Sequence, residues 1–242
     1  MPMPLILAVV ALASAVLVMP AHAQQSQESE RGVTGKVALG YLATSGNTES
    51  TNANAGLNLV YTLPIWRHGF DFSAVNASTD EQTTAEAYSA KYEGRRSFGE
   101  RSYLFTALDW TRDRFSAFEQ QVSETVGYGR RVIDRERHVL DLGIGAGARQ
   151  STRLDGTRER DAIVRGSAEY LWSIADGSEF RQRLVTESGS TNTMVEAVSE
   201  LRTRLVGNLG VVLSYRLRRN SQVPEGIEPI DRFTSIALEY AF

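Results

Sequence analysis

The chain of 242 residues carries 29 acidic and 26 basic side chains, giving a formal net charge of −3. This mildly acidic balance argues against a protein that binds nucleic acid by neutralising its phosphates. The chain has no cysteine, which excludes disulfides, thiolate nucleophiles and zinc sites with cysteine ligands. Its length suits one all-β domain, since sandwiches and barrels of this size form single domains.

The N-terminus has the pattern of a cleaved secretory signal. Residues 5–18 form an unbroken run of apolar and small side chains, and an A-x-A cleavage site ends at Ala23. The run is too short to cross a bilayer comfortably as a helix. The sequence therefore predicts a signal peptide over residues 1–23, a short disordered polar segment over residues 24–31, and the folded domain over residues 32–242.

From residue 32 onward, apolar side chains alternate with polar ones at a period of two. The alternation predicts an all-β protein with about twelve antiparallel strands of about nine to eleven residues, a length that lets a tilted strand cross the hydrocarbon layer. Residues 102–110 carry apolar side chains on both faces. Their inward face therefore stays undetermined at this point.

The polar connections between these segments alternate in length. Longer loops are predicted at residues 45–50, 77–84, 111–121, 151–161, 188–193 and 220–231, and short turns at residues 64–68, 99–101, 134–137, 175–178 and 206–208. This alternation is typical of a transmembrane β-barrel with short periplasmic turns and longer extracellular loops. An even strand number also places both chain ends on the periplasmic side. A soluble β-sandwich is the alternative, and it would bring the apolar faces together in a core.

Tyrosine and tryptophan lie near the predicted strand ends, where an aromatic girdle contacts the membrane interface. The last strand ends in Tyr240-Ala241-Phe242, with both aromatic residues in phase with its apolar face. A C-terminal aromatic residue of this kind resembles the signature that the outer-membrane assembly machinery reads. Tyr240 and Phe242 are therefore the predicted assembly signal.

With the apolar faces outward, the later strands direct charged side chains into the barrel. The predicted lumen-lining residues are Arg165, Glu169, Arg181, Arg183, Glu196, Glu200, Arg202, Arg204, Arg216 and Arg218. Either these side chains line a narrow water-filled channel, or they pair across the interior and fill a narrow barrel. Because the arginines outnumber the acids, the channel is slightly favoured and would select anions.

Residue types that carry chemistry are sparse in the predicted domain. Gly143, Gly145 and Gly147 lie inside an alternating strand, where glycines make room for a bulky side chain or let the sheet bend, and they do not form a dinucleotide loop. His68 and His138 lie beside predicted short turns, and neither has a second histidine at ligand spacing. The sequence therefore indicates no catalytic residue, metal site or cofactor, and a hydrolase is the least supported class.

The predicted outer loops carry charges of both signs. These are Asp80, Glu81, Arg112, Asp113, Arg114, Asp155, Arg158, Glu159, Asp161, Glu225, Glu228 and Asp231. Solvated loop charges are the favoured interpretation. The alternative is contact with lipopolysaccharide phosphates or divalent ions.

Four stretches of the chain together resemble a known family. They are residues 40–49 (GYLATSGNTE), 109–115 (DWTRDRF), 127–131 (GYGRR) and 142–147 (LGIGAG). The chain resembles the YdiY-like salt-induced outer-membrane proteins over nearly all of the predicted domain. The resemblance implies an outer-membrane barrel linked to salt response, in a family catalogued as domain of unknown function 481, and it implies no catalytic residues.

The sequence thus favours a monomeric twelve-strand barrel in the outer membrane, either a narrow channel or an envelope-stabilising protein under osmotic or salt stress. The stress role is implied by the resemblance alone. A surface interaction protein, whose loops bind a partner while the barrel anchors them, is the alternative from another class. The expected partners are the lipid bilayer with its lipopolysaccharide and the assembly machinery, without nucleic acid.

Overall fold

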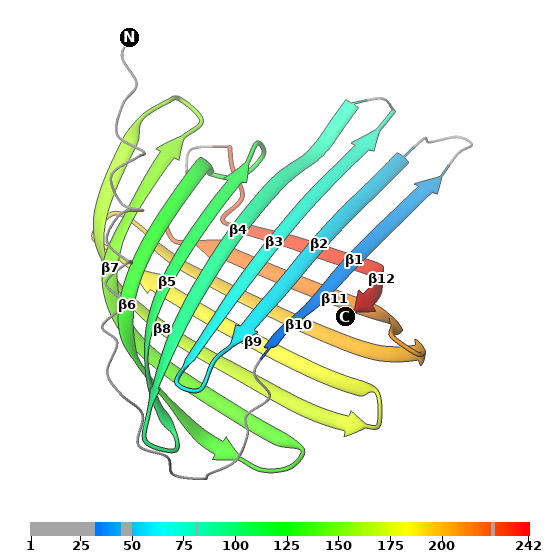
Figure 1. The fold of residues 1–242 in the computed structure, drawn as a ribbon. Coiled ribbons are helices and arrows are strands. Elements are labelled where there is room, and N and C mark those ends of the chain that lie inside the picture. The colour runs from blue at the N-terminus through cyan, green and yellow to red at the C-terminus, as the bar shows by residue number, and fades with distance from the viewer. Residues whose placement is uncertain (1–31, 45–49, 81, 224–225) are drawn as a thin grey trace.

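The computed structural model describes residues 32–44, 50–80, 82–223 and 226–242. The predicted signal peptide and polar segment lie outside these residues, as do the SGNTE loop and two of the predicted loop charges, Glu81 and Glu225. The described residues form twelve strands (Figure 1). The strands are β1 Gly32–Thr44, β2 Ser50–Thr62, β3 Trp66–Thr79, β4 Gln82–Phe98, β5 Ser102–Asp113, β6 Phe118–Asp134, β7 His138–Arg153, β8 Arg158–Ala175, β9 Ser178–Ser188, β10 Thr193–Val206, β11 Leu209–Asn220 and β12 Ile230–Ala241.

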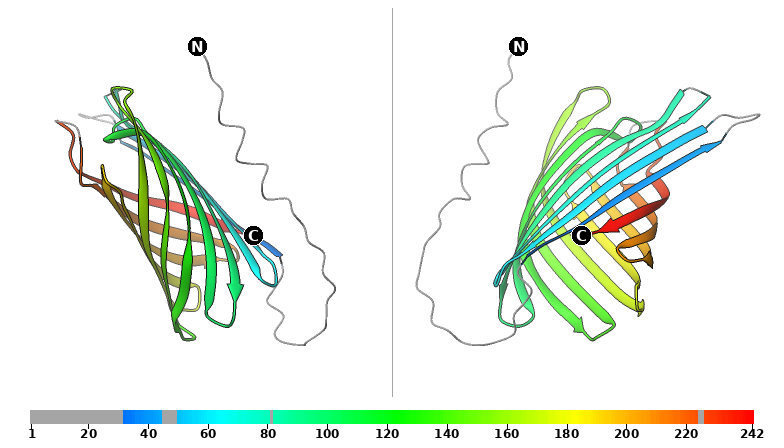
Figure 2. Two further views of the ribbon diagram at one scale, coloured as in Figure 1. Left: turned by 90° about the vertical axis from the view of Figure 1, so that its left-hand side faces the viewer. Right: turned by 45° about the vertical axis from the view of Figure 1, so that its right-hand side comes forward.

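The strands form one closed antiparallel barrel in which each strand pairs with its neighbours in the sequence and β1 pairs with β12. Their steep tilt is visible in Figure 2. The β1–β12 seam is short, running from Lys36↔Ala241 to Leu39↔Leu238. Gly35 and Phe242 extend it by exchanging two backbone hydrogen bonds of 2.8 Å. The predicted barrel of about twelve antiparallel strands is confirmed.

The strands are longer than the sequence predicted, with lengths between 11 and 18 residues. The predicted loop over residues 111–121 shrinks to residues 114–117, and the one over residues 77–84 shrinks to two residues between β3 and β4. Polar residues beyond each apolar stretch remain paired, because ladder hydrogen bonds do not depend on side-chain polarity. Each strand rises about 3.3 Å per residue. The added polar residues therefore extend the strand pairing beyond the apolar band, which is the ring of exposed apolar side chains around the barrel.

The barrel is apolar outside and polar inside. Leu39, Ile144 and Ile236 are each more than 60% exposed on the outer face, whereas Glu187 and Asn220 are at most 2% exposed. A soluble sandwich would show the reverse arrangement, so the structure contradicts that alternative. In the described part of the chain, no helix has the length and apolar character needed to cross a membrane.

The inward face of β5 carries two aromatic residues that pack against glycines, Tyr103 against Gly129 and Phe105 against three others. Phe105 is buried, while Leu104 is exposed on the outer face. A Cβ atom on Gly127 or Gly145 would lie 2.6 Å or 3.1 Å from the Phe105 ring, and one on Gly143 would lie 3.3 Å from it. The prediction that the glycine run makes room for a bulky side chain is therefore confirmed at Gly143, whereas at Gly145 the backbone carbonyl oxygen of Val126, 2.6 Å from such a Cβ atom, is closer than the ring.

Gly147, the third glycine of that run, has a different neighbour. A Cβ atom there would lie 1.9 Å from the backbone carbonyl oxygen of Glu124 on the adjacent strand β6. Close approach of two backbones, and not an aromatic ring, requires glycine at this position.

Two ends of the barrel are named below by their connections. The turn end holds the connections over residues 63–65, 99–101, 135–137, 176–177 and 207–208, together with the start of β1 and the end of β12. The loop end holds the other connections, of which residues 221–229 form the longest one. Both ends of the strand series thus lie at the turn end.

Candidate functional site

Six charged side chains meet in the middle of the barrel and are called the mid-barrel cluster. They are Lys91, Asp109, Arg165, Glu187, Glu196 and Arg218. Arg165 Nη1 donates to Asp109 Oδ2 and to Glu187 Oε1, each at 2.7 Å. Glu196 accepts from Arg218 Nη2 at 2.7 Å and also from Lys91 Nζ. Each charge in the cluster therefore has an opposite charge beside it.

The contact between Lys91 and Glu196 joins opposite walls of the barrel. Lys91 lies on β4 and Glu196 on β10, and in a closed ring of twelve strands these two are six strands apart in either direction. In Figure 1, β1–β4 form the front wall and β9–β12 pass behind it. Ser123 on β6 adds another link between non-adjacent strands by donating to Glu187 on β9 at 3.1 Å. The barrel interior is therefore crossed by polar contacts at this level.

The positions of these charges follow from strand alternation and strand register. Alternation along each strand puts every second side chain inside, and the register aligns Glu196 with Arg218 on neighbouring strands. Glu196 and Glu187 are almost fully buried. Removing charges from water costs several kcal/mol per ion in real proteins, which only close opposite charges and hydrogen bonds offset. Because these charges are buried, each one requires an opposite charge beside it.

A second group, the turn-end cluster, consists of Glu93, Arg95, Arg131, Asp141 and Glu169. Arg95 donates to Asp141 at 3.1 Å and to Glu169 at 3.0 Å, and also contacts Glu93. Its guanidinium lies 4.8 Å from the ring centre of Tyr103. Since Arg95 lies on β4, Asp141 on β7 and Glu169 on β8, this cluster also joins non-adjacent strands.

A third group, the loop-end cluster, consists of Arg149, Asp161, Asn192 and Asn220. Asp161 was predicted to be a solvated loop charge, and that prediction is wrong. It is 6% exposed and accepts hydrogen bonds from the Ser190 hydroxyl at 2.7 Å and from Thr191. The sequence placed it in a loop because β8 begins with polar residues, but alternation continues there and points Asp161 inward.

Asn192 ties two loop-end connections together. Its Oδ1 accepts hydrogen bonds from the backbone of Ser221 at 2.9 Å and Gln222 at 3.2 Å. Its Nδ2 donates to Asn220 Oδ1 at 2.8 Å. The connections that follow β9 and β11 are thereby held against each other at the loop end.

The predicted lumen-lining residues divide between these clusters and the wall. Arg165, Glu196 and Arg218 belong to the mid-barrel cluster, and Glu169 belongs to the turn-end cluster. Arg183 interacts electrostatically with Glu169, and Arg216 with Glu196.

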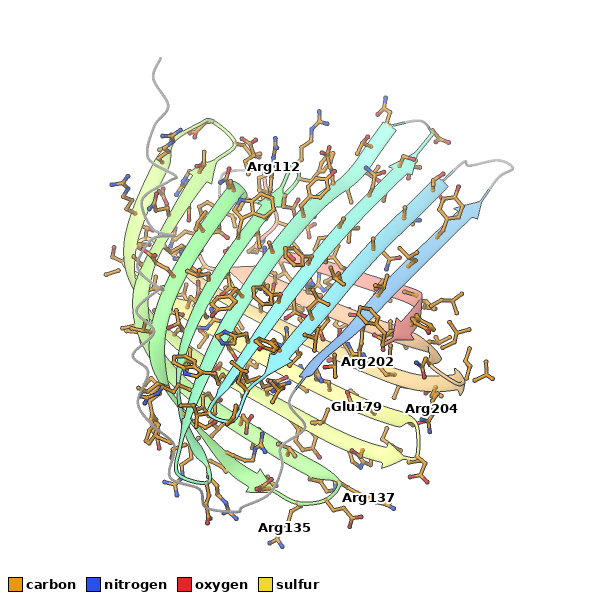
Figure 3. The ribbon with its side chains drawn as sticks, in the orientation of Figure 1. Arg112, Arg135, Arg137, Glu179, Arg202 and Arg204 are labelled. Carbon is orange, nitrogen blue, oxygen red and sulfur yellow. The ribbon has the colours of Figure 1, made fainter. Side chains whose placement is uncertain are left out.

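Three other predicted residues form ion pairs along the wall near the turn end. Arg202 contacts Glu200 at 3.1 Å and Glu239 at 3.2 Å, and Arg181 contacts Glu179 at 3.6 Å. Figure 3 shows Arg202 near Glu179, and the two are 3.7 Å apart. Arg202 is thereby joined to β9 and β12, whereas its pair with Glu200 and the pair of Arg181 with Glu179 each lie within one strand.

Arg204 lies apart from the clusters. Its side chain is exposed, and its backbone N–H donates to the carbonyl oxygen of Gly177 at 2.7 Å. It is the last inward position of β10, where the barrel opens to solvent.

Several interior residues were missed by the sequence reasoning, which assigned inward charges only from β8 onward. They include Lys91, Arg95, Asp109, Asp141 and Arg149. For most of them the sequence contained a signal for the inward face, because they alternate with outward apolar residues. Asp109 lies within residues 102–110, where apolar side chains on both faces left the inward face undetermined. Three of these five side chains are cations and two are acids, so they do not remove the excess of positive charge on which the expected anion preference rested.

Charges at the exposed loop end form looser contacts. Arg112 lies 3.4 Å from Glu119, and Figure 3 shows it at the end opposite Arg135 and Arg137. Such exposed pairs contribute little to stability. Asp155, in the connection between β7 and β8, accepts a 2.8 Å hydrogen bond from the backbone N–H of Thr157, which lowers the pKa of Asp155.

Both histidines of the barrel belong to aromatic stacks at the turn end. His68 stacks on Trp66 with ring centres 5.7 Å apart, and its Nδ1 is 2.9 Å from the Tyr92 hydroxyl. His138 repeats this arrangement with Trp172 at 5.9 Å and the Tyr170 hydroxyl at 2.7 Å. The sequence treated the two histidines as isolated polar residues. In the sequence, the signal for this role was that the two histidines alternate in phase with the aromatic positions.

Residues that could bind a metal are not grouped in this structure. Among the described residues, no set of three or more histidine, aspartate or glutamate side chains has the spacing to hold a metal ion. The acids of the three interior clusters instead contact arginine, lysine or hydroxyl groups.

Residues 37–242 match the model of a family described as "Protein of unknown function, DUF481". The chain belongs to the DUF481 family. "Uncharacterized protein YdiY" from Escherichia coli (strain K12) is 28% identical to this DUF481 protein over 208 residues, which cover 86% of this chain and 82% of the relative. The resemblance to YdiY-like proteins is therefore confirmed.

Solved barrels share the general architecture of this DUF481 protein. An outer-membrane channel from Pseudomonas putida F1 aligns with a TM-score of 0.48 and 12% identity, covering 90% of this chain and 99% of that one. The NanC porin aligns with a TM-score of 0.47 and 11% identity, covering 85% of this chain and 97% of that one. Scores and identities this low support no inference about function.

Proposed function

We propose that this protein is an outer-membrane β-barrel that stabilises the cell envelope, with an interior closed by ion pairs. The observation that carries the proposal is the contact between Lys91 and Glu196, which joins strands on opposite sides of the ring. A wide diffusion pore has no such contact across its lumen. The closed alternative is therefore favoured over the anion channel that the arginine excess favoured.

The outer-membrane location is supported by the surface of the barrel. Its outer face exposes large apolar side chains on many strands, a pattern that would cause aggregation in water and that lipid would cover. The two His–Trp–Tyr stacks lie at the turn end, where an aromatic girdle would meet the interface. The role under salt stress is supported by the family resemblance.

The space between the charges is small. The cavity beside the mid-barrel cluster has a volume of about 30 Å³, room for about two water molecules. A hydrated ion passing this level would have to separate buried ion pairs. The proposal therefore predicts a barrel that inserts in a bilayer without steady conductance.

Single-channel recording in planar bilayers tests this proposal. Protein purified from outer membranes is expected to insert without stepwise current. The triple variant K91A/E196A/R218A removes the contact between opposite walls without leaving an unpaired charge among the three residues, and is expected to conduct. The double variant R153A/E159A is the matched control, because it removes an interior pair of 2.6 Å that joins the adjacent strands β7 and β8.

Either of two results would contradict the proposal. Stepwise, anion-selective current through the unmodified protein would restore the channel hypothesis. A triple variant that folds and inserts but conducts no better than R153A/E159A would show that the Lys91–Glu196 contact does not close the barrel. Heat-dependent mobility on denaturing gels establishes folding for each variant.

Phe242 is proposed to serve both barrel closure and recognition by the assembly machinery. Its backbone completes the β1–β12 seam, and its ring lies against Gly35. We expect F242A to reduce the amount of folded barrel in outer membranes several-fold, measured as the heat-modifiable band. I236A is the control, since Ile236 lies on β12, the strand that Phe242 follows, and is also exposed on the outer face. Equal amounts of the two variants would contradict this role.

A further inference from the structure

The small cavity beside the mid-barrel cluster has features of a binding site. It lies among eight strands, from β4 to β11, so it occupies the centre of the barrel. Its charged lining residues are the six members of the mid-barrel cluster and Arg149. Counting Lys91, Arg149, Arg165 and Arg218 against Asp109, Glu187 and Glu196 gives four positive and three negative charges. These seven side chains carry a net charge of +1, and Asp161, which is buried 3.5 Å from Arg149 outside the lining, brings the group to neutral.

Among the four cations that line the cavity, Arg149 has a buried nitrogen without a hydrogen-bond partner. It is 3% exposed, and its Nη2 donates to the carbonyl oxygen of Asn192 at 2.6 Å and lies 3.5 Å from Asp161. Its Nη1 is buried and makes no hydrogen bond to any described residue. Oε2 of Glu187 is 3.8 Å from this nitrogen, beyond hydrogen-bond distance.

Two acids lie near Arg149, and neither accepts a hydrogen bond from its Nη1. Glu187 accepts from Arg165 and Ser123 through Oε1, and its Oε2 is the oxygen that lies 3.8 Å from Arg149 Nη1. Asp161 accepts from Ser190 and Thr191. A buried guanidinium N–H without an acceptor costs free energy. An acceptor in the cavity would remove that cost.

We propose that the cavity binds one small monovalent inorganic anion of the size of chloride, held by Arg149 Nη1. The volume of about 30 Å³, which holds about two water molecules, also suits one ion of this size and is too small for larger organic anions. This site goes beyond the proposed envelope role and does not depend on whether the barrel conducts. It would make stability of the barrel depend on the identity of the anion as well as on ionic strength.

Thermal unfolding of the purified protein in sodium chloride and in sodium gluconate tests the site. At equal ionic strength, saturating chloride is expected to raise the unfolding midpoint by about 2–4 °C over gluconate, following a one-site saturation curve. R149Q is expected to lose this difference. R153Q is the matched control, because Arg153 is a later inward arginine of the same strand and does not line the cavity. It should keep the difference.

Crystals of the unmodified protein grown in sodium bromide give an independent readout that needs no variant. An anomalous peak is expected within hydrogen-bond distance of Arg149 Nη1. A cavity without such a peak, or midpoints that are equal in chloride and gluconate, would overturn the proposal and leave water as the occupant. A chloride effect that R149Q retains would place the anion elsewhere.

Discussion

Replacing Glu187 with alanine is expected to lower the free energy of unfolding by about 3–5 kcal/mol. Glu187 is 1% exposed and accepts hydrogen bonds from Arg165 at 2.7 Å and from Ser123 at 3.1 Å. Arg149 is also within 3.8 Å. Truncation leaves Arg165 and Arg149, both buried, without the negative charge of Glu187 beside them. A buried charge that loses its partner costs more free energy than a buried neutral group does.

Urea unfolding in lipid vesicles, followed by tryptophan fluorescence, measures this loss. E119A is the matched control, because it removes an acid from an exposed ion pair with Arg112 and should change stability by less than about 1 kcal/mol. Similar losses for the two variants would show that the mid-barrel cluster is not the stabilising element inferred here. E187Q should lie between them, since its amide oxygen still accepts hydrogen bonds.

Replacing Gly129 with alanine is expected to cost about 1–3 kcal/mol through overpacking. A Cβ atom at this position would lie 2.2 Å from the ring of Tyr103, so ring or backbone must move. The same ring faces Arg95 at 4.8 Å, and its displacement would also disturb the turn-end cluster. G56A is the control, since the nearest atom to a Cβ on Gly56 is 3.8 Å away.

A double-mutant cycle identifies the clash as the cause. In the Y103A background, G129A is expected to cost less than about 0.5 kcal/mol, because the ring is absent. Unfolding free energies of the four proteins give the coupling between the two positions. Additive losses would contradict the clash, and would point to the backbone conformation at Gly129 as the reason for glycine there.

The strand pattern of this barrel was predictable because lipid and lumen impose opposite demands on alternate residues. Leu140 and Leu142 lie outside while Asp141 lies inside, and this contrast is visible in sequence. Loop lengths were less predictable. Asp113 and Asp161 look like loop residues, but both belong to paired strand segments beyond the apolar band. Polarity alone does not distinguish a protruding strand from a loop.

The candidate site was predictable only in part. Alternation gives the face on which Lys91 and Glu196 lie, but not that these residues meet, since they are 105 positions apart and on opposite walls. Their contact depends on the cross-section of the closed barrel, which no local pattern encodes. The sequence therefore predicted inward charges on the later strands without predicting their partners.

Carbodiimide coupling of the native protein tests the contact across the lumen most directly. This reagent joins an amine to a carboxylate that touches it, and the sequence contains two lysines, Lys36 and Lys91. Lys36 lies 3.7 Å from Glu239 on the adjacent strand β12, so that pair serves as the internal control.

Mass spectrometry of the digested product identifies the carboxylate bound to each lysine. An amide between Lys91 and Glu196 is expected, together with the control amide between Lys36 and Glu239. Coupling of Lys91 to Asp71 or Asp109, its register partners on β3 and β5, in place of Glu196 would contradict the account, because it would show that the opposite walls do not meet.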